Sequence, residues 1–187
     1  MLRKKLLTIA CVVGILGCGA CFLPPVNSTP HYPPPPPIRE ELRGIKAIRV
    51  FVDDASGAHT VDTSEVASCV AGNLDERAGQ THIKNEDRKT PRPGDAVLQI
   101  TLQKVTTTQN PPAQQENERR WSLELTIDAT LTGANGETLW EQKSQSYRDD
   151  GYFQSNDPVK IWKDSGVSLW LSGRFSDRLL GAMFYGD

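Results

Sequence analysis

The chain has 187 residues, with 21 lysine and arginine side chains against 23 aspartate and glutamate side chains, for a formal net charge of −2. Because the basic residues are spread among acidic ones, this composition excludes a surface that tracks nucleic-acid phosphates, and we expect no nucleic-acid partner. About 140 residues follow position 44, which is enough for one domain with a single hydrophobic core.

The first seventeen residues, 1–17, have the pattern of an export signal. Three basic residues at positions 3–5 precede an apolar stretch over Leu6–Leu16, which is shorter than the about 20 residues that a stable transmembrane helix needs. The stretch ends in Ile15-Leu16-Gly17-Cys18, which fits the lipobox of bacterial lipoproteins. The sequence therefore predicts cleavage before Cys18 and lipidation of its thiol and amine.

The alternative is an ordinary secretory peptide whose cysteines are incidental. Cys11 lies too early in the apolar stretch. A lipobox ending at Cys21 would have Cys18 at its first position, which is normally aliphatic, so Cys18 is the favoured lipidation site. Several acyl chains make a stable membrane anchor. Gly19 is not the aspartate that retains lipoproteins at the inner membrane, so we expect an outer-membrane lipoprotein facing the periplasm. The mature chain would keep 18 basic and 23 acidic side chains, a net charge of −5.

Residues 18–44 are predicted to be the lipidated N-terminus and a linker. Eight of the chain's 13 prolines lie between Phe22 and Pro37. Proline lacks an amide hydrogen and fixes φ, so this segment favours an extended polyproline conformation that reaches roughly 40 Å. A spacer role is the simplest interpretation, and recognition by a proline-binding groove is the alternative.

The first elements of the domain are a strand and a helix. Alternating apolar residues predict a strand over Lys46–Val52. Asp62 and Glu65 have the spacing of a capping box, which predicts a helix that begins after Asp62 and ends at Gly79. A short strand is expected over Thr81–Ile83.

The clearest strand patterns come later in the chain. Apolar and polar residues alternate over Ala96–Gln103 and again over Trp121–Thr132, as expected for a sheet covered on one face. Asn135-Gly136 is typical of a type I′ turn, so we expect the second strand to pair with Glu137–Arg148 in a hairpin.

The C-terminal segment after Asp157-Pro158 has apolar residues at three- and four-residue spacings, which predicts one long amphipathic helix. Gly166 and Gly173 weaken it and indicate a kink or close contact with the sheet. The elements together predict an α+β domain over residues 45–187, a two-layer sandwich in which two helices pack on one face of a four-stranded mixed or antiparallel sheet.

We find no constellation of residues typical of catalysis, a metal site or a cofactor. The three histidines have no partner at ligand spacing, and Asp53-Asp54 and Asp149-Asp150 are adjacent residues that face opposite ways on a strand. We therefore expect no enzyme, although an envelope hydrolase with distant converging groups stays an alternative. Cys69 occupies an apolar helical position and is predicted to be a buried free thiol, with a disulfide to Cys21 as the alternative.

Several phrases of the sequence resemble the lipopolysaccharide-assembly lipoprotein family LptE. They are the lipobox, the strand Ile45–Val50, the strand opening Gly94–Leu98, the turn and strand Asn135–Glu141, and Tyr147-Arg148-Asp149. The likeness covers most of residues 45–185 by the order of elements. The chain departs from the family in its start, because Gly19-Ala20-Cys21 and a proline linker follow Cys18 in place of the usual Gly-Tyr.

The resemblance implies a plug that sits inside an LptD-like outer-membrane β-barrel, helps it fold and assists lipopolysaccharide delivery to the cell surface. Polar strand faces agree with such a role. Cationic side chains would be needed to contact lipid A phosphates, and the exposed candidates are Arg88, Lys89, Arg92, Arg119 and Arg120. Solvated loops without a ligand are the alternative for these residues, and a docking lipoprotein of another secretion or efflux assembly is the alternative for the whole chain.

Overall fold

Five strands form one mixed sheet in the part of the chain that the computed structural model describes, residues 36–86, 92–111, 119–153, 157–163 and 165–186. The chain divides into the units Met1–Pro34 and Pro35–Asp187, and all described residues belong to the second. The predicted signal peptide and the lipidation residue Cys18 therefore lie outside the described residues. None of the described helices is long and apolar enough to cross a membrane.

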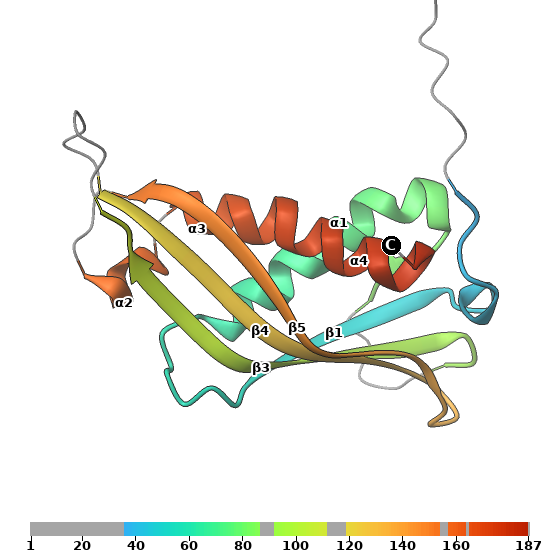
Figure 1. The fold of residues 1–187 in the computed structure, drawn as a ribbon. Coiled ribbons are helices and arrows are strands. Elements are labelled where there is room, and N and C mark those ends of the chain that lie inside the picture. Colours follow the sequence, from blue (N-terminus) through green and yellow to red (C-terminus); the bar gives the residue numbers. More distant parts are fainter. Residues whose placement is uncertain (1–35, 87–91, 112–118, 154–156, 164, 187) are drawn as a thin grey trace, which may run out of the picture. The chain divides into compact units, whose positions relative to one another are not determined.

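The strands lie side by side in the order β2-β1-β3-β4-β5 (Figure 1). β1 pairs in parallel with both β2 and β3, whereas β3, β4 and β5 are antiparallel. The bounds are β1 (Ala47–Asp54), β2 (Lys84–Asn85), β3 (Asp95–Gln109), β4 (Arg119–Gly133) and β5 (Thr138–Phe153). The prediction of a four-stranded sheet is therefore wrong by one strand, although the α+β class and the mixed pairing are confirmed.

One face of the sheet carries the core. The apolar positions of the predicted alternation, such as Leu98, Ile100 and Leu125, are fully buried, and the residues between them face away from the helices. Period-2 alternation places successive side chains on opposite faces, which is why this pattern correctly identified β3 and β4. All the helices lie on this one side of the sheet (Figure 1).

α1 (Thr63–Thr81) begins at Asp62, whose Oδ1 accepts the amides of Ser64 at 2.9 Å and Glu65 at 3.4 Å. The reciprocal half of the predicted capping box is absent, because the Glu65 carboxylate accepts a hydrogen bond from the Ser168 hydroxyl instead. The helix also runs two residues past Gly79 and ends at His82, which has a φ of 60°. The short strand predicted over Thr81–Ile83 is found just after those residues, as β2.

The C-terminal segment is interrupted where one long helix was predicted. A short turn, α2 (Pro158–Ile161), is separate, and α3 (Ser165–Trp170) continues through the π-helical stretch η2 (Leu171–Phe175) into α4 (Ser176–Tyr185). A Cβ at Gly173 would meet nothing within 4 Å, so this glycine marks the π stretch and not a close contact with the sheet. A 3-10 turn, η1 (Glu40–Leu42), precedes β1.

Carbonyl groups near the π stretch are bound by side chains from within the domain. The Asn73 amide of α1 donates to the Ser172 carbonyl at 2.8 Å, and the Ser176 hydroxyl donates to the Leu171 carbonyl at 2.5 Å. The π-helical turn widens the hydrogen-bonding pattern and leaves such groups to find other partners. Asn73 therefore joins the two main helices across the core.

The hairpin between β4 and β5 is present, but its turn differs from the predicted type I′. That turn needs a positive φ at Asn135, which is not among the described residues with positive φ, whereas Gly136 has a φ of 84°. The Gly136 amide donates to the Gly133 carbonyl at 2.9 Å. The chain therefore turns across Gly133–Gly136, and of the two residues expected in the left-handed region only Gly136 adopts it.

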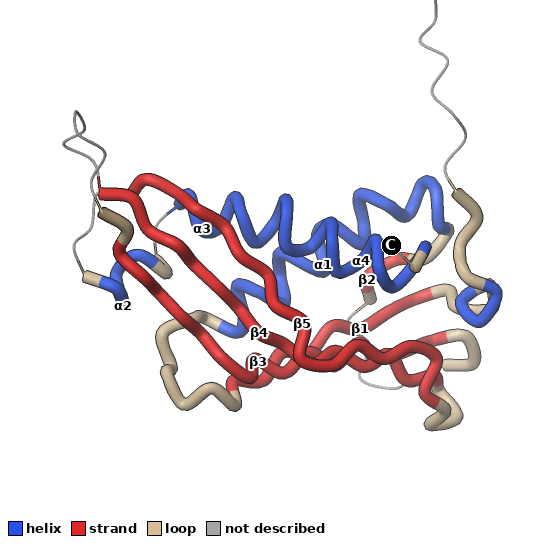
Figure 2. Tube along the Cα trace, viewed as in Figure 1, coloured by secondary structure: helices blue, strands red, loops and turns tan. Residues whose placement is uncertain are grey.

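β3, β4 and β5 bend sharply halfway along their length, so that the sheet curls around the helices (Figure 2). Register shifts occur between Leu102 and Lys104 of β3, and opposite Ile127–Ala129 of β4, where β5 carries one extra residue. A third shift lies near the hairpin turn, between Leu131 and Thr132. Such bulges increase twist and bend the strand. One sheet can therefore cover α1 with one half and the C-terminal helices with the other.

Candidate functional site

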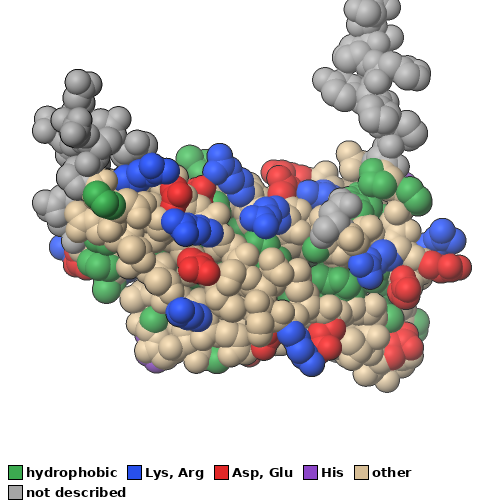
Figure 3. Space-filling model, in the orientation of Figure 1, with side chains coloured by type: hydrophobic (Ala, Val, Ile, Leu, Met, Phe, Trp, Pro, Cys, Tyr) green, Lys and Arg blue, Asp and Glu red, His purple; other side chains and the backbone are tan. Residues whose placement is uncertain are grey.

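The face of β3–β5 that points away from the helices is polar from Gln99 onward; we call this part the outward face. Val97, at the start of β3, is an apolar residue on the same side just before it. The described members of the outward face are Gln99, Thr101, Gln103, Lys104, Thr106, Thr108, Arg120, Ser122, Glu124, Thr126, Asp128, Thr130, Thr132, Thr138, Glu141, Ser146, Arg148 and Asp150. Figure 3 shows one side of the domain, where acidic and basic side chains are interspersed on a mostly polar surface.

Asp128 lies on β4 at the centre of the outward face, between the bulge of β3 at Gln103 and the bulge of β5 at Ser144. Its Oδ1 accepts the Ser144 amide at 2.7 Å, and its Oδ2 accepts the Gln103 side-chain amide at 2.8 Å. Ser144 has a φ of 51°, a conformation that few non-glycine residues adopt. The Asp128 carboxylate therefore connects the irregular positions of both neighbouring strands.

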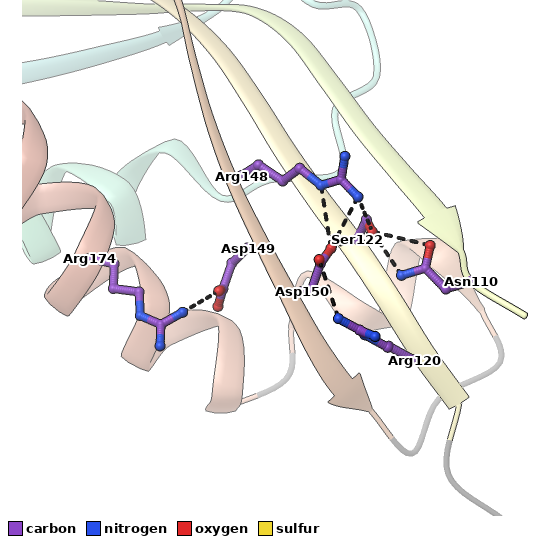
Figure 4. A network of polar contacts seen from close by, with 7 residues as sticks. All are labelled: Asn110, Arg120, Ser122, Arg148, Asp149, Asp150 and Arg174. Atoms are coloured by element: carbon purple, nitrogen blue, oxygen red, sulfur yellow. Dashed lines mark hydrogen bonds and ion pairs between the residues drawn. The ribbon is translucent and has the colours of Figure 1, made fainter. Parts of the chain in front are cut away.

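A second polar cluster lies at the far end of the outward face, around Ser122 (Figure 4). The Ser122 hydroxyl donates to Asp150 Oδ1 at 2.5 Å and accepts from Arg148 Nη2 at 3.0 Å and from Asn110 Nδ2 at 2.9 Å. Arg120 Nη2 lies 3.5 Å from Asp150 Oδ2. We call these five residues the Ser122 cluster.

The electrostatics of the Ser122 cluster favour an ionised aspartate. The hydrogen bond from Ser122 lowers the pKa of Asp150 below its usual value, partial burial opposes this, and the charges of Arg148 and Arg120 lower the pKa further. Hydrogen bonds and positive charges favour a carboxylate because they stabilise its charged form. The cluster is therefore a hydrogen-bonded ion-pair network on the surface of the sheet.

Asp149 faces the opposite way from Asp150, as the sequence predicted. Its carboxylate accepts a hydrogen bond of 2.6 Å from Arg174 Nη1, on the helix side of β5 (Figure 4). Asp53 and Asp54 also separate: Asp53 accepts from the Gln99 amide, while Asp54 accepts from Ser56 in the following turn. Neither pair of carboxylates converges.

Of the five expected lipopolysaccharide-contacting residues, the structure describes the side chains of Arg92 and Arg120 alone. Arg88 and Lys89 lie outside the described residues, and only the backbone of Arg119 is described. Arg92 is exposed in the turn before β3, at the end of the sheet near Gly133, whereas Arg120 lies at the other end, in the Ser122 cluster. Among the described residues, Arg92 and Arg120 therefore do not form one site.

Arg148 and Arg174 were not among the residues predicted from the sequence. Arg148 follows from the alternation of β5, because it lies two residues before Asp150 and on the same face. Arg174 has no such signal, since its contact with Asp149 joins residues 25 positions apart through tertiary packing.

Cys69 is a free thiol, as expected, but it is half-buried and not fully buried. Its Sγ lies 4.0 Å from the Ser168 carbonyl oxygen. Burial raises the pKa of the Cys69 thiol, and the nearby Glu65 carboxylate adds to this effect. Cys21, the proposed disulfide partner, lies outside the described residues.

The sequence matches no protein-family model and no curated protein. Its fold is similar to solved structures. A minor lipoprotein from Acinetobacter baumannii has a TM-score of 0.44 at 9% identity, with 74% of this chain and 90% of that chain covered. Rare lipoprotein B from Shewanella oneidensis has a TM-score of 0.37 at 14% identity, with 72% of this chain and 92% of that chain covered. PelC from Paraburkholderia phytofirmans, a dodecamer, has a TM-score of 0.37 at 15% identity, with 72% of this chain and 88% of that chain covered.

Two of these three structures are bacterial lipoproteins by name. At such TM-scores and identities, the likeness assigns neither a family nor a function to this chain.

Proposed function

We propose that the protein is a lipid-anchored, non-catalytic subunit of an outer-membrane β-barrel lipopolysaccharide translocon, acting on the periplasmic side as a plug that assists barrel assembly. The observation that carries this proposal is the outward face of β3–β5. From Gln99 onward it presents hydroxyl, amide and charged groups to its surroundings.

A barrel interior supports this role because it is polar and wet in outer-membrane proteins. A domain enclosed by such a barrel must replace the hydrogen bonds that its surface made to water, since an unpaired polar group costs free energy once buried. Threonine, serine and glutamine side chains both donate and accept, so the outward face suits a partner with mixed polarity.

The N-terminal residues support the proposed location. The lipobox ending at Cys18 provides for a membrane anchor, and in the extended conformation that proline favours the linker up to Pro37 would reach roughly 40 Å. Such a reach would let a lipid-anchored domain act at a barrel away from the lipid surface.

A pulldown of the tagged, lipidated protein from outer membranes in mild detergent tests this proposal. We expect an LptD-like barrel in stoichiometric amount by mass spectrometry. The double variant Thr101→Lys/Thr130→Lys adds two charges to the outward face and should lower barrel recovery at least fivefold. Ser68→Lys/Gln80→Lys adds the same charges on the exposed side of α1 and should leave recovery unchanged.

Two outcomes contradict the proposal. Equal loss of the barrel in both double variants would show that the outward face is not the docking surface. Recovery of a different envelope assembly, with lipidation of Cys18 verified by peptide mass, would favour the docking lipoprotein of a secretion or efflux system.

A further inference from the structure

β5 is an edge of the sheet. It pairs with β4 on one side, and no described strand pairs with its other side. It is also the longest strand, at 16 residues. An edge strand presents backbone amide and carbonyl groups that a further strand can bind.

The C-terminal helix follows this edge and lines it with arginines. The Arg178 guanidinium lies 5.4 Å from the centre of the Tyr147 ring, and Arg174 binds Asp149 at 2.6 Å. The two contacts are thus two residues apart along β5, at Tyr147 and Asp149, and four residues apart along the helix, at Arg178 and Arg174. Because alternate residues of a strand are about 6.6 Å apart, the two arginines repeat at close to the spacing of same-side residues on an extended chain.

A groove runs between β5 and the C-terminal helix. It consists of two adjoining hollows of about 370 and 560 Å³, which share Tyr147, Asp177 and Arg178. Buried Trp170 and Phe175 lie beneath the smaller hollow. The edge of β5 therefore borders an open channel that has room for another chain.

The charge around this edge is positive although the chain is acidic overall. Arg77, Arg120, Arg148, Arg174 and Arg178 are accompanied by four carboxylates, those of Asp149, Asp150, Asp177 and Glu124, which lies opposite Arg148 on β4. Farther along β5, Glu141 and Lys143 pair with each other. Arg178 has no carboxylate within ion-pair distance among the described residues, and the Arg174 side chain is 76% exposed despite its ion pair. Figure 3 shows several basic side chains, with acidic ones among them, where β5 borders the helix.

We propose that the edge of β5 binds an extended acidic segment of a partner protein, which adds to the sheet as a sixth strand. Carboxylates on alternate residues of that segment would meet Arg174 and Arg178 on the helix side, and residues between them would meet Arg148 on the outward face. Backbone hydrogen bonds would supply affinity and the arginines would supply selectivity. A lipid phosphate would use the arginines but not the backbone groups of the edge.

This surface differs from the outward face, and the inference does not depend on which envelope assembly the protein serves. Binding of a synthetic segment to the isolated protein reports on the edge alone, whereas the pulldown reports on the barrel. Failure of one is therefore distinguishable from failure of the other.

The test uses full-length lipidated protein in non-ionic detergent and a labelled ten-residue peptide of alternating threonine and glutamate, followed by fluorescence anisotropy. We expect saturable binding that weakens with salt, because exposed charges are screened. Arg174→Gln/Arg178→Gln should weaken binding at least tenfold. Arg43→Gln/Lys84→Gln, which removes two exposed charges elsewhere, should change it less than twofold.

Two further probes separate strand addition from simple charge attraction. A peptide with the same glutamates but N-methylated alternate amides cannot pair with the edge, and it should bind at least tenfold more weakly. Equal binding of the methylated peptide, an equal effect of both double variants, or no binding of the parent peptide would overturn the proposal. Displacement of the peptide by short-chain phosphatidylglycerol at lower concentration than by unlabelled peptide would also overturn it, in favour of a lipid headgroup site.

Discussion

Ser122 is the residue through which the ionisation of Asp150 is tied to folding. The pKa of Asp150 is lowered in the folded chain, chiefly by the hydrogen bond from Ser122. A carboxyl with a lowered folded pKa stabilises the fold above its ordinary pKa of about 3.9, and this stability is lost as the pH falls through the folded value. The pH dependence of folding therefore reports on this contact.

We predict that Ser122→Ala lowers the free energy of unfolding by about 1 kcal/mol at pH 7, because a hydrogen bond to a charged group is removed. The difference from the unmodified protein should narrow below about pH 3.9, as Asp150 becomes protonated in both. Urea unfolding between pH 7 and pH 3 measures this. Ser146→Ala is the control, because the Ser146 Oγ lies 2.9 Å from the Thr126 Oγ1 and contacts no charged group there. Its difference in unfolding free energy from the unmodified protein should not change with pH. A constant difference for Ser122→Ala as well would contradict the prediction.

The alternating pattern of a strand predicts which way each side chain points, but it does not predict which residues of other elements that side chain contacts. The opposite directions of Asp149 and Asp150 follow from period-2 alternation, and the structure confirms them. The clustering of Arg120 with Asp150 requires the register of β4 against β5, which no local pattern specifies. Arg174 meets β5 only through the packing of the π stretch against the sheet, so no local pattern could pair it with Asp149.

At the scale of elements, two glycines have opposite conformational requirements. Gly136 adopts a φ of 84° in the hairpin turn, where a side chain is strained, whereas Gly72 lies inside α1 with nothing within 4 Å of an added Cβ. We predict that Gly136→Ala destabilises the protein by about 1 kcal/mol and that Gly72→Ala stabilises it by about 0.5–1 kcal/mol. Thermal unfolding of both variants measures this. A shift of the same sign in both would contradict the assignment of the turn.

The elements that the sequence predicted well are those with long, uniform patterns. β3, β4 and α1 combine an uninterrupted period with a covered face, so local preference and burial agree. β5 extends five residues beyond the predicted Arg148, because Asp149-Asp150-Gly151 resembles a strand terminus while pairing with β4 keeps it extended. The prediction of a single C-terminal helix is wrong because the spacing of apolar residues does not distinguish a π-helical turn from a regular α-helical one.

At the scale of the whole domain, the strand order was the least predictable feature. Local patterns predict β1, and more weakly the two-residue β2, as strands, but their places in the sheet depend on where α1 returns the chain. The bend of β3–β5 was also absent from the prediction, although β3 carries a trace of it: two polar residues, Gln103 and Lys104, stand between the core-facing Leu102 and Val105 and break the alternation. Asp128 is where the bulges on both neighbouring strands are connected.

The Asp128 carboxylate should therefore stabilise the bent form of the sheet as a whole. We predict that Asp128→Ala lowers the free energy of unfolding by about 1–2 kcal/mol, because the Ser144 amide and the Gln103 side chain both lose their acceptor. Hydrogen exchange of the Ser144 amide should accelerate in parallel. Asp128→Asn keeps an acceptor for Ser144, and the Gln103 amide can rotate to accept from it, so this control should lose less than half as much. Equal losses in both variants would mean that charge, and not the connection between the two bulges, accounts for the effect of Asp128.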